Sequence, residues 1–325
     1  MGVHTGHGVS VAFALTFAAG LATVLGGMVV FSRRLVHLAN PTSLAVALSI
    51  SGGVMIFISF VEIFNESVHL LDEGIKSRSP TLSTNTARGH AWLAATGCFA
   101  LGITLIYVVD AIVHRLAPEH EATEVDRLEN LGETMDQFEK AHHVQPQGEK
   151  KMVYATDSRL PSKVDEDNRR ALQRMGLLSA LAIGLHNIPE GIATYVGSVR
   201  NTSVGFSLAV GIALHNIPEG IAVAAPIYFA TGSRWRGIMW CIVSALAEPL
   251  GGMLAWLAIG DGMDPISEGI LFGIVCGIMV CICLKELWPT SFRFAKEKTY
   301  LVAYGTFGGM FIMITSLILF AYAGV

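Results

Sequence analysis

Apolar residues occupy eight long stretches of this chain, and charged residues gather mainly in the segments between them. Each stretch is long enough for a helix to cross a bilayer core of about 30 Å, which takes about 20 residues. The pattern therefore predicts an all-α integral membrane protein with eight transmembrane helices. We expect these helices over residues 8–32, 42–65, 92–114, 171–196, 203–230, 236–258, 266–288 and 299–323.

Composition agrees with this interpretation. The chain has 325 residues, of which 52% are hydrophobic and only 15% are charged, whereas a soluble domain has about 25% charged residues. The basic residues flank apolar segments and form no patch with interleaved aromatics, so we expect membrane lipid around the protein and no nucleic-acid partner. The five cysteines lie within apolar segments without a Cys-x-x-Cys pair, which argues against a disulfide framework or a thiolate metal site.

The chain divides into three parts. Residues 1–114 hold the first three expected helices, residues 115–170 form a polar segment, and residues 171–325 hold the last five helices. The polar segment contains few aromatics and predicts a flexible loop. Seven Lys and Arg residues follow the first, fifth and seventh helices, against four in the loops of the opposite side. Because basic residues favour the cytoplasmic side, we expect a cytoplasmic loop at 115–170 and extracellular or luminal termini. Whether the membrane is the plasma membrane or an organelle membrane stays open.

An internal repeat is the most informative feature of the sequence. The motif LHNIPEGIA occurs at Leu185–Ala193 and again 29 residues later at Leu214–Ala222. Each copy lies in the middle of an apolar helix, and a short loop joins the two helices, so they run antiparallel and can face each other. An ionisable side chain at mid-membrane costs about 2.5 kcal/mol or more. A bound divalent cation would compensate for that cost.

The spacing within the repeat supports metal binding. Glu190 lies about 40° around the helix from His186, so both side chains can reach one ion. Asn187 lies on the other side of Glu190, where it could help to bind a second ion. The same geometry holds for the second copy, with His215, Asn216 and Glu219. Two facing copies thus surround a site that could hold one ion or two.

Further ionisable residues lie in apolar helices. Glu248 stands in ALAEPLGG and Glu62 stands in ISFVEIF. Together with the two glutamates of the repeat they would give four negative charges, which match two divalent cations; helix-packing hydrogen bonds are the alternative role. For Lys285 and Glu286, in CLKELWP, we expect no ligand role, with Lys285 extending its amine toward the membrane surface.

The ligand types limit the metal. Imidazole, carboxylate and amide groups suit Zn²⁺, Fe²⁺, Mn²⁺ and Co²⁺. Copper(I) prefers sulfur ligands, and calcium and magnesium prefer oxygen. We therefore expect a divalent transition-metal ion as the bound and transported partner, and no resident cofactor.

At these motifs the sequence resembles the ZIP (Zrt/Irt-like) family of metal transporters, most closely its ZupT-like branch. The resemblance rests on the two HNIPEG copies and on EPLGG, SFVEIF and KELWP, and it covers most of the chain. It implies an eight-helix bundle in which the fourth and fifth helices line the transport site. It also implies movement of metal toward the cytoplasm by alternating access. Whether the protein assembles as a homodimer stays open.

The resemblance also implies a ligand set. A first metal position would be formed by His186, Glu190, His215 and Glu219. A second would be formed by Asn187, Glu190, Asn216, Glu219 and Glu248. Glu62 would lie beside the first position, with Met55 nearer the entrance.

A membrane metalloenzyme and a metal sensor are the two alternative classes of function. A membrane metalloenzyme, such as a di-iron oxidase or an intramembrane protease, would show Glu-x-x-His or His-Glu-x-x-His. Here the order is His-x-x-x-Glu, with proline inside the motif. A metal sensor would need a signalling domain, for which the sequence shows no indication. Transport of a divalent metal ion is favoured, with zinc first and iron, manganese and cobalt also open.

Overall fold

A computed structural model describes residues 6–32, 35, 40–116, 163–259 and 264–323. These residues are almost entirely helical and contain no strand. The elements in chain order are α1 (Gly6–Gly27), a 3-10 turn η1 (Met28–Phe31), α2 (Pro41–Ile58), a π-helical turn η3 (Ser59–Phe64), α3 (Asn65–Arg78), α4 (Thr84–Leu116), α6 (Lys163–Arg200), α7 (Thr202–Thr231), α8 (Arg234–Ala245), α9 (Ala247–Ile259), α10 (Pro265–Ile282), a second π-helical turn η4 (Cys283–Leu287), α11 (Trp288–Ala295) and α12 (Tyr300–Ala323).

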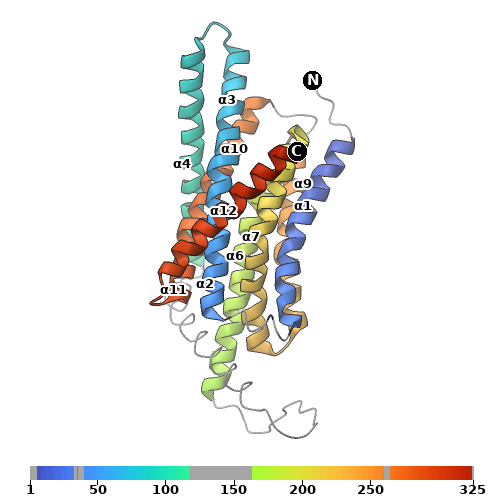
Figure 1. The fold of residues 1–325 in the computed structure, drawn as a ribbon, viewed down its shortest axis with the longest axis vertical. Coiled ribbons are helices and arrows are strands. Elements are labelled where there is room, and N and C mark those ends of the chain that lie inside the picture. Colours follow the sequence, from blue (N-terminus) through green and yellow to red (C-terminus); the bar gives the residue numbers. More distant parts are fainter. Residues whose placement is uncertain (1–5, 33–34, 36–39, 117–162, 260–263, 324–325) are drawn as a thin grey trace.

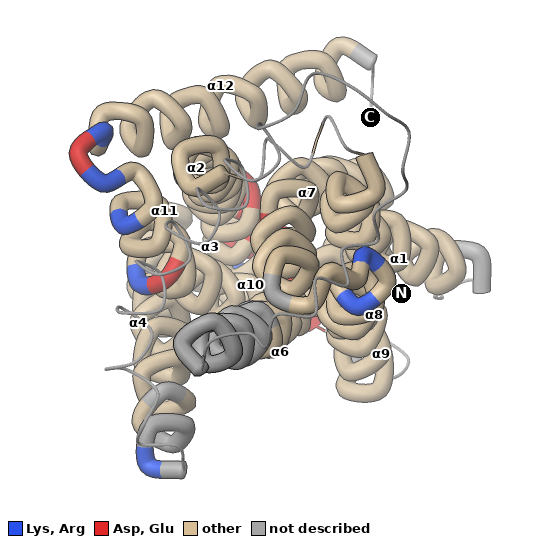
Figure 2. The backbone as a smooth tube through the Cα atoms, turned by 90° about the horizontal axis from the view of Figure 1, so that it is seen from below, with Lys and Arg blue, Asp and Glu red and all other residues tan. Residues whose placement is uncertain are grey.

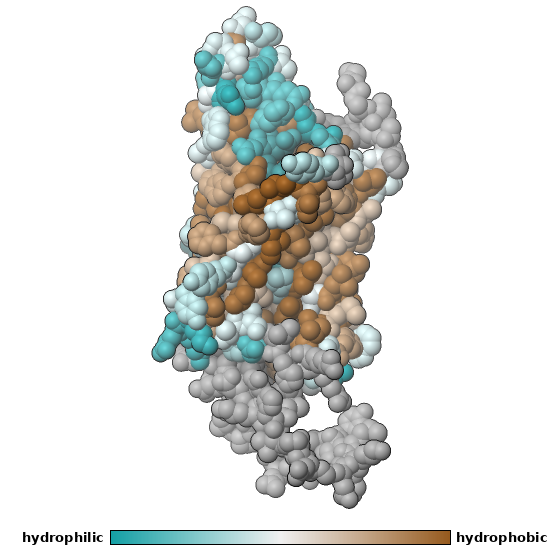
Figure 3. Space-filling model, in the orientation of Figure 1, coloured by the Kyte–Doolittle hydropathy of each residue, from teal (hydrophilic) through white to brown (hydrophobic). Residues whose placement is uncertain are grey.

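Seven helical segments of the described chain are long and apolar enough to cross a membrane. α6, which carries the first copy of the repeat, runs through the same bundle beside α7 as an eighth long helix (Figure 1). The surface shows an apolar band with hydrophilic residues beyond it (Figure 3). These features confirm the expected all-α membrane fold.

The helices pack as two groups. α1, α6, α7, α8 and α9 contact one another, and α2, α3, α4, α10, α11 and α12 contact one another. The groups lie side by side when the bundle is viewed along its length (Figure 2). They meet chiefly where α2 packs on α7 and where α10 packs on α6. Both copies of the repeat therefore belong to one group, at its border with the other.

The second expected helix, 42–65, is longer than predicted. α2, η3 and α3 form one continuous helical rod from Pro41 to Arg78, and α4 begins at Thr84 instead of residue 92. α3 is amphipathic, and it buries Val68, Leu71 and other small or apolar residues against α4 and α10. This packing stabilises the helix beyond the apolar stretch, whose end alone set the predicted boundary.

Two other boundaries also differ. α6 begins at Lys163, so the last eight residues of the expected 115–170 loop are helical; residues 117–162 lie outside the described chain. The expected helix 236–258 is divided at Leu246 into α8 and α9. Pro249 explains the division, because it has no N–H to donate to the carbonyl of Ala245.

Glycines within the repeat allow neighbouring helices to touch. A methyl group on Gly191 would overlap the carbonyl oxygen of Glu248 on α9, and one on Gly220 would overlap that of Thr23 on α1. The small side chain thus lets α6 approach α9, and lets α7 approach α1, at backbone distance. This close approach brings Glu248 to the repeat helices.

We predict that Gly191→Ala destabilises the protein by about 1–3 kcal/mol, because the overlap is with backbone that must shift. Gly308→Ala, also in a helix but with open space at its side chain, is the matched control and should stabilise slightly through its helix propensity. Thermal unfolding of the two purified variants in the same detergent measures the difference. Equal melting temperatures would contradict the packing described here.

Candidate metal centre

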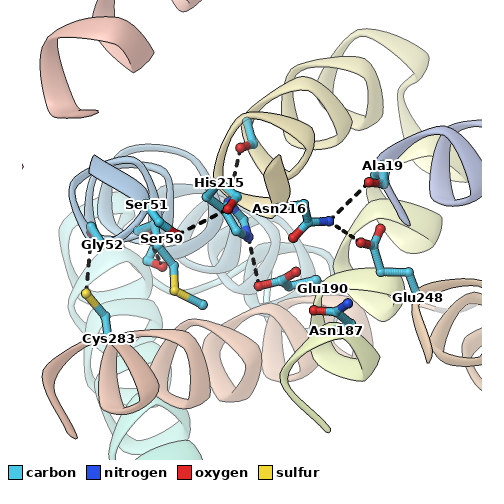
Figure 4. A network of polar contacts seen from close by, with 12 residues as sticks. Ala19, Ser51, Gly52, Ser59, Asn187, Glu190, His215, Asn216, Glu248 and Cys283 are labelled. Atoms are coloured by element: carbon cyan, nitrogen blue, oxygen red, sulfur yellow. Dashed lines mark hydrogen bonds and ion pairs between the residues drawn. The ribbon is translucent and has the colours of Figure 1, made fainter. Parts of the chain in front are cut away.

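The two copies of the repeat lie on adjacent antiparallel helices. α6 and α7 pack along their length and continue without a break through Pro189 and Pro218. Neither proline can donate to the carbonyl four residues earlier, so each helix has a backbone oxygen without its usual partner beside the motif. Figure 4 shows His215 and Glu190 directed toward each other, with Asn216 directed toward Glu248 and Ala19.

His215 and Glu190 form the direct contact between the two copies. His215 Nε2 lies 3.0 Å from Glu190 Oε1, and His215 Nδ1 lies 3.1 Å from the carbonyl oxygen of Gly211. Both side chains are completely buried. α2 of the other helix group also reaches this point, because Ser51 Oγ donates to the backbone oxygen of His215 (3.3 Å).

The asparagines of the two copies face α1, α8 and α9. Asn216 Nδ2 donates to Glu248 Oε1 and to the carbonyl oxygen of Ala19 (3.1 Å). Asn187 Nδ2 donates to the carbonyl oxygen of Ser244 (3.2 Å), one helical turn before Glu248 in sequence. The side-chain nitrogen of each asparagine thus donates to the protein, and the side-chain carbonyl oxygen remains available to accept or ligate.

Several buried polar atoms of this cluster have no hydrogen-bond partner. They are His186 Nδ1, Asn187 Oδ1, Glu190 Oε2, Asn216 Oδ1, Glu219 Oε2 and Glu248 Oε2. Leaving a buried acceptor unpaired costs about 1–3 kcal/mol, and more if it is charged. Five of the six atoms are oxygens, and all lie on residues that the sequence predicts as ligands. This donor set fits a divalent transition-metal ion.

The carboxylates and imidazoles are also close enough to act on one another electrostatically. Glu190 and Glu219 interact with both histidines and with Glu248. The structure therefore brings together seven of the eight predicted residues, in a centre where the negative charges of three carboxylates repel each other. A divalent cation would relieve that repulsion.

In this conformation the side chains of the centre do not converge on one metal position. Within the described chain, no three histidine, cysteine, aspartate or glutamate side chains are grouped tightly enough to hold one metal ion. The reason lies in the contacts already made. His215 contacts Glu190, whereas Nε2 of His186 contacts a residue of another helix segment.

The partner of His186 is Glu286, a residue for which we expected no ligand role. His186 Nε2 lies 3.1 Å from Glu286 Oε2. Glu286 belongs to the π-helical turn η4, and such turns re-aim side chains within a helix and are common at functional sites. Its carboxylate is partly exposed. The helical segment continues through KELWP to Ala295, beyond the expected end at residue 288. That Glu286 has no ligand role stays a prediction. The sequence feature that could have pointed to its contact with His186 is that Glu286 is an acidic residue within an otherwise apolar helix.

Lys285 behaves more nearly as expected. Its side chain is exposed and its amine lies 5.4 Å from the ring centroid of Tyr107 on α4. It therefore points away from His186 although it is adjacent to Glu286 in sequence.

Glu62 is the predicted residue that the structure does not bring to the cluster. It lies half-buried in η3, and Glu66 is close enough to repel its charge. No contact described in the structure joins Glu62 to either copy of the repeat. In this conformation the acidic neighbour of Glu62 is therefore Glu66 of α3.

Comparison with known proteins gives a consistent result. A family model described as ZIP Zinc transporter matches residues 7–317. A protein named Zinc transporter ZupT from Streptococcus mutans is 36% identical over 309 residues, covering 95% of this chain and 97% of the relative. Proteins of the same name from Corynebacterium efficiens and Lysinibacillus sphaericus are each 38% identical, over 95% and 96% of this chain and 97% and 98% of the relatives.

The contact between His186 and Glu286 leads to a prediction. Glu286→Gln should lower saturable metal uptake by about 10-fold or more, since losing the carboxylate partner of a ligating histidine typically costs 10–100-fold. Lys285→Gln changes a charge in the same turn but leaves the His186 contact intact, and should retain uptake. Initial rates of ⁶⁵Zn²⁺ uptake at matched membrane expression compare the two. Equal rates in both variants would show that the contact has no part in transport.

Proposed function

The chain belongs to the ZIP zinc transporter family, and from this premise we propose that it carries Zn²⁺ across a membrane through the His/Glu/Asn centre between α6 and α7. Membership makes the chain a transporter rather than an enzyme. The observation that carries the proposal is the cluster of unpaired buried oxygens on the duplicated motif. A cluster of this kind needs a cation, and imidazole beside carboxylate suits zinc.

The proposed centre has two metal positions. His186, Glu190, His215 and Glu219 would bind the first ion. Asn187, Asn216 and Glu248 would bind the second, sharing Glu190 and Glu219 with the first. The free carbonyl oxygens of the two asparagines support the second position, because oxygen ligates zinc whereas an amide nitrogen does not. Fe²⁺, Mn²⁺ and Co²⁺ use the same ligand types and are the further candidate substrates.

Proton release should accompany binding. An imidazole must be neutral to ligate a metal, so a histidine that holds an extra proton for its carboxylate contact must lose it. His215 contacts Glu190 and His186 contacts Glu286. Zinc would replace the contact of His215 with Glu190, whereas His186 would ligate through its unpaired Nδ1 and keep its Nε2 contact with Glu286.

The proposed orientation places the end formed by the start of α8 and the turn after α11 in the cytoplasm. Lys and Arg gather at this end, which Figure 2 shows in the foreground. The start of α1 and the end of α12 lie at the opposite end, which would be extracellular or luminal (Figure 1). The positive-inside rule supports this assignment, and zinc would move from the second end toward the first.

The first test concerns the glutamates shared by both positions. Glu190→Gln and Glu219→Gln keep the side-chain volume but remove the charge, and each should lower zinc uptake more than about 100-fold, beyond the loss expected for an outer partner of a ligand. Glu297→Gln, on the exposed turn between α11 and α12, is the control for a lost carboxylate. Uptake by proteoliposomes loaded with a zinc-sensitive dye gives the rates. Near-normal uptake in either glutamate variant would exclude this site assignment.

The second test addresses the number of ions bound. Glu248 would ligate the second position alone, so Glu248→Gln should reduce bound zinc from two ions per chain to one. Elemental analysis of the purified protein after equilibration in buffered zinc measures that ratio. A value of one in the unmodified protein would show that the centre holds a single ion, while an unchanged value of two in the variant would remove Glu248 from the ligand set.

A further inference from the structure

A cluster of charged side chains joins the two helix groups at the end opposite to the start of α6. Arg200, the last residue of α6, lies 2.7 Å from Glu268 on α10, 2.6 Å from Glu73 and 3.8 Å from Glu66 on α3. α6 belongs to the group that carries the repeat, whereas α3 and α10 belong to the other group. One guanidinium therefore bridges the border between the groups.

The position of Arg200 connects this cluster to the metal centre. Arg200 follows Glu190 in the same continuous helix by ten residues, a rise of about 15 Å at 1.5 Å per residue. The cluster thus lies about half a membrane thickness beyond the centre, at the end where α3 and the start of α10 lie (Figure 1). If metal enters the centre from this end along the border between the groups, it must pass Arg200.

The geometry of the cluster suits a contact that forms and breaks. Arg200 is about one quarter exposed and Glu268 about one tenth exposed, so their attraction is only partly screened by water. Arginine offers five donors in a planar fork and can hold several carboxylates at once. Because the three carboxylates carry more negative charge than Arg200 can neutralise, separation of the groups would leave an acidic surface that attracts cations.

We propose that Arg200 acts as a latch, and that its ion pairs with Glu66, Glu73 and Glu268 hold this end closed and must break for metal to enter. The proposal rests on the transport function proposed above and adds a positioning residue that touches no metal. It differs from the ion pair between Arg78 and Asp264 at the same end, because that pair joins α3 to the start of α10 within one group.

Bridging experiments test whether the latch must open. In the double variant Arg200→Cys, Glu268→Cys, a bifunctional thiol reagent of suitable length should lower zinc uptake at least about 10-fold, because it blocks a required conformational step. A reducing agent that cleaves the bridge should restore uptake. The unmodified protein treated with the same reagent controls for its own cysteines.

The matched control uses the same carboxylate within a single group. Glu73→Cys, Glu268→Cys joins α3 to α10, and bridging it should leave uptake within about twofold of the unbridged variant, since those helices need not separate. Intact mass confirms the bridge in each case. Normal uptake with the Arg200–Glu268 bridge in place would overturn the latch. A complete absence of saturable zinc uptake before any bridging would instead count against the transport function.

A charge-removing variant gives a second readout. Arg200→Gln should populate the state open at this end, and so lower the KM for zinc supplied there by about threefold or more. Zinc affinity of the central site in detergent should stay within about twofold, as for distant sites. Arg78→Gln also removes one positive charge at this end, but Arg78 does not bridge the border between the groups. The KM of this variant should therefore change less. Equal KM shifts in the two variants would reduce the effect to surface charge and overturn the latch.

Discussion

The structure depends on the cost of keeping carboxylates inside a membrane. Glu190, Glu219 and Glu248 are essentially without exposed surface, and each has an oxygen with no hydrogen-bond partner. Burial of such groups is opposed by several kcal/mol unless opposite charge compensates. The imidazole of His215 and the amide of Asn216 provide part of that compensation. In the proposed function the carried ion would provide the rest, so that stability of the centre and selection of its cargo would have the same physical origin.

The helix arrangement follows from bringing these groups together. The side chains that gather here come from α6, α7 and α9. Glycine at the contact positions allows α6 to touch α9, and α7 to touch α1, at backbone distance. The proposed ligands therefore belong to one packed unit. The second group contributes Glu286, Ser51 and the carboxylates around Arg200. It contacts the centre from outside and lies against the border that a permeating ion would follow.

Most of the fold was predictable because apolar length and a repeated polar motif are local signals. The eight helices and the antiparallel pairing of the repeat helices both follow from spacing and residue type. The extent of α3 was not predictable in the same way, because its stability comes from packing on α4 and α10 beyond the apolar stretch. The contact of Glu286 with His186 depends on a π-helical turn, whose extra residue per turn alters which side chains share a face.

The two π-helical turns explain why the surroundings of two carboxylates could not be predicted from the sequence. Both Glu62 and Glu286 lie in such turns, in helices of the second group. Arguments from sequence spacing assume a regular helix of 3.6 residues per turn. In η3 the irregular turn leaves Glu62 along α3 with Glu66, while in η4 it turns Glu286 toward His186. Sequence spacing therefore predicted which side chains of the regular helices α6 and α7 lie together, but it did not predict the contacts of side chains where the backbone departs from the regular period.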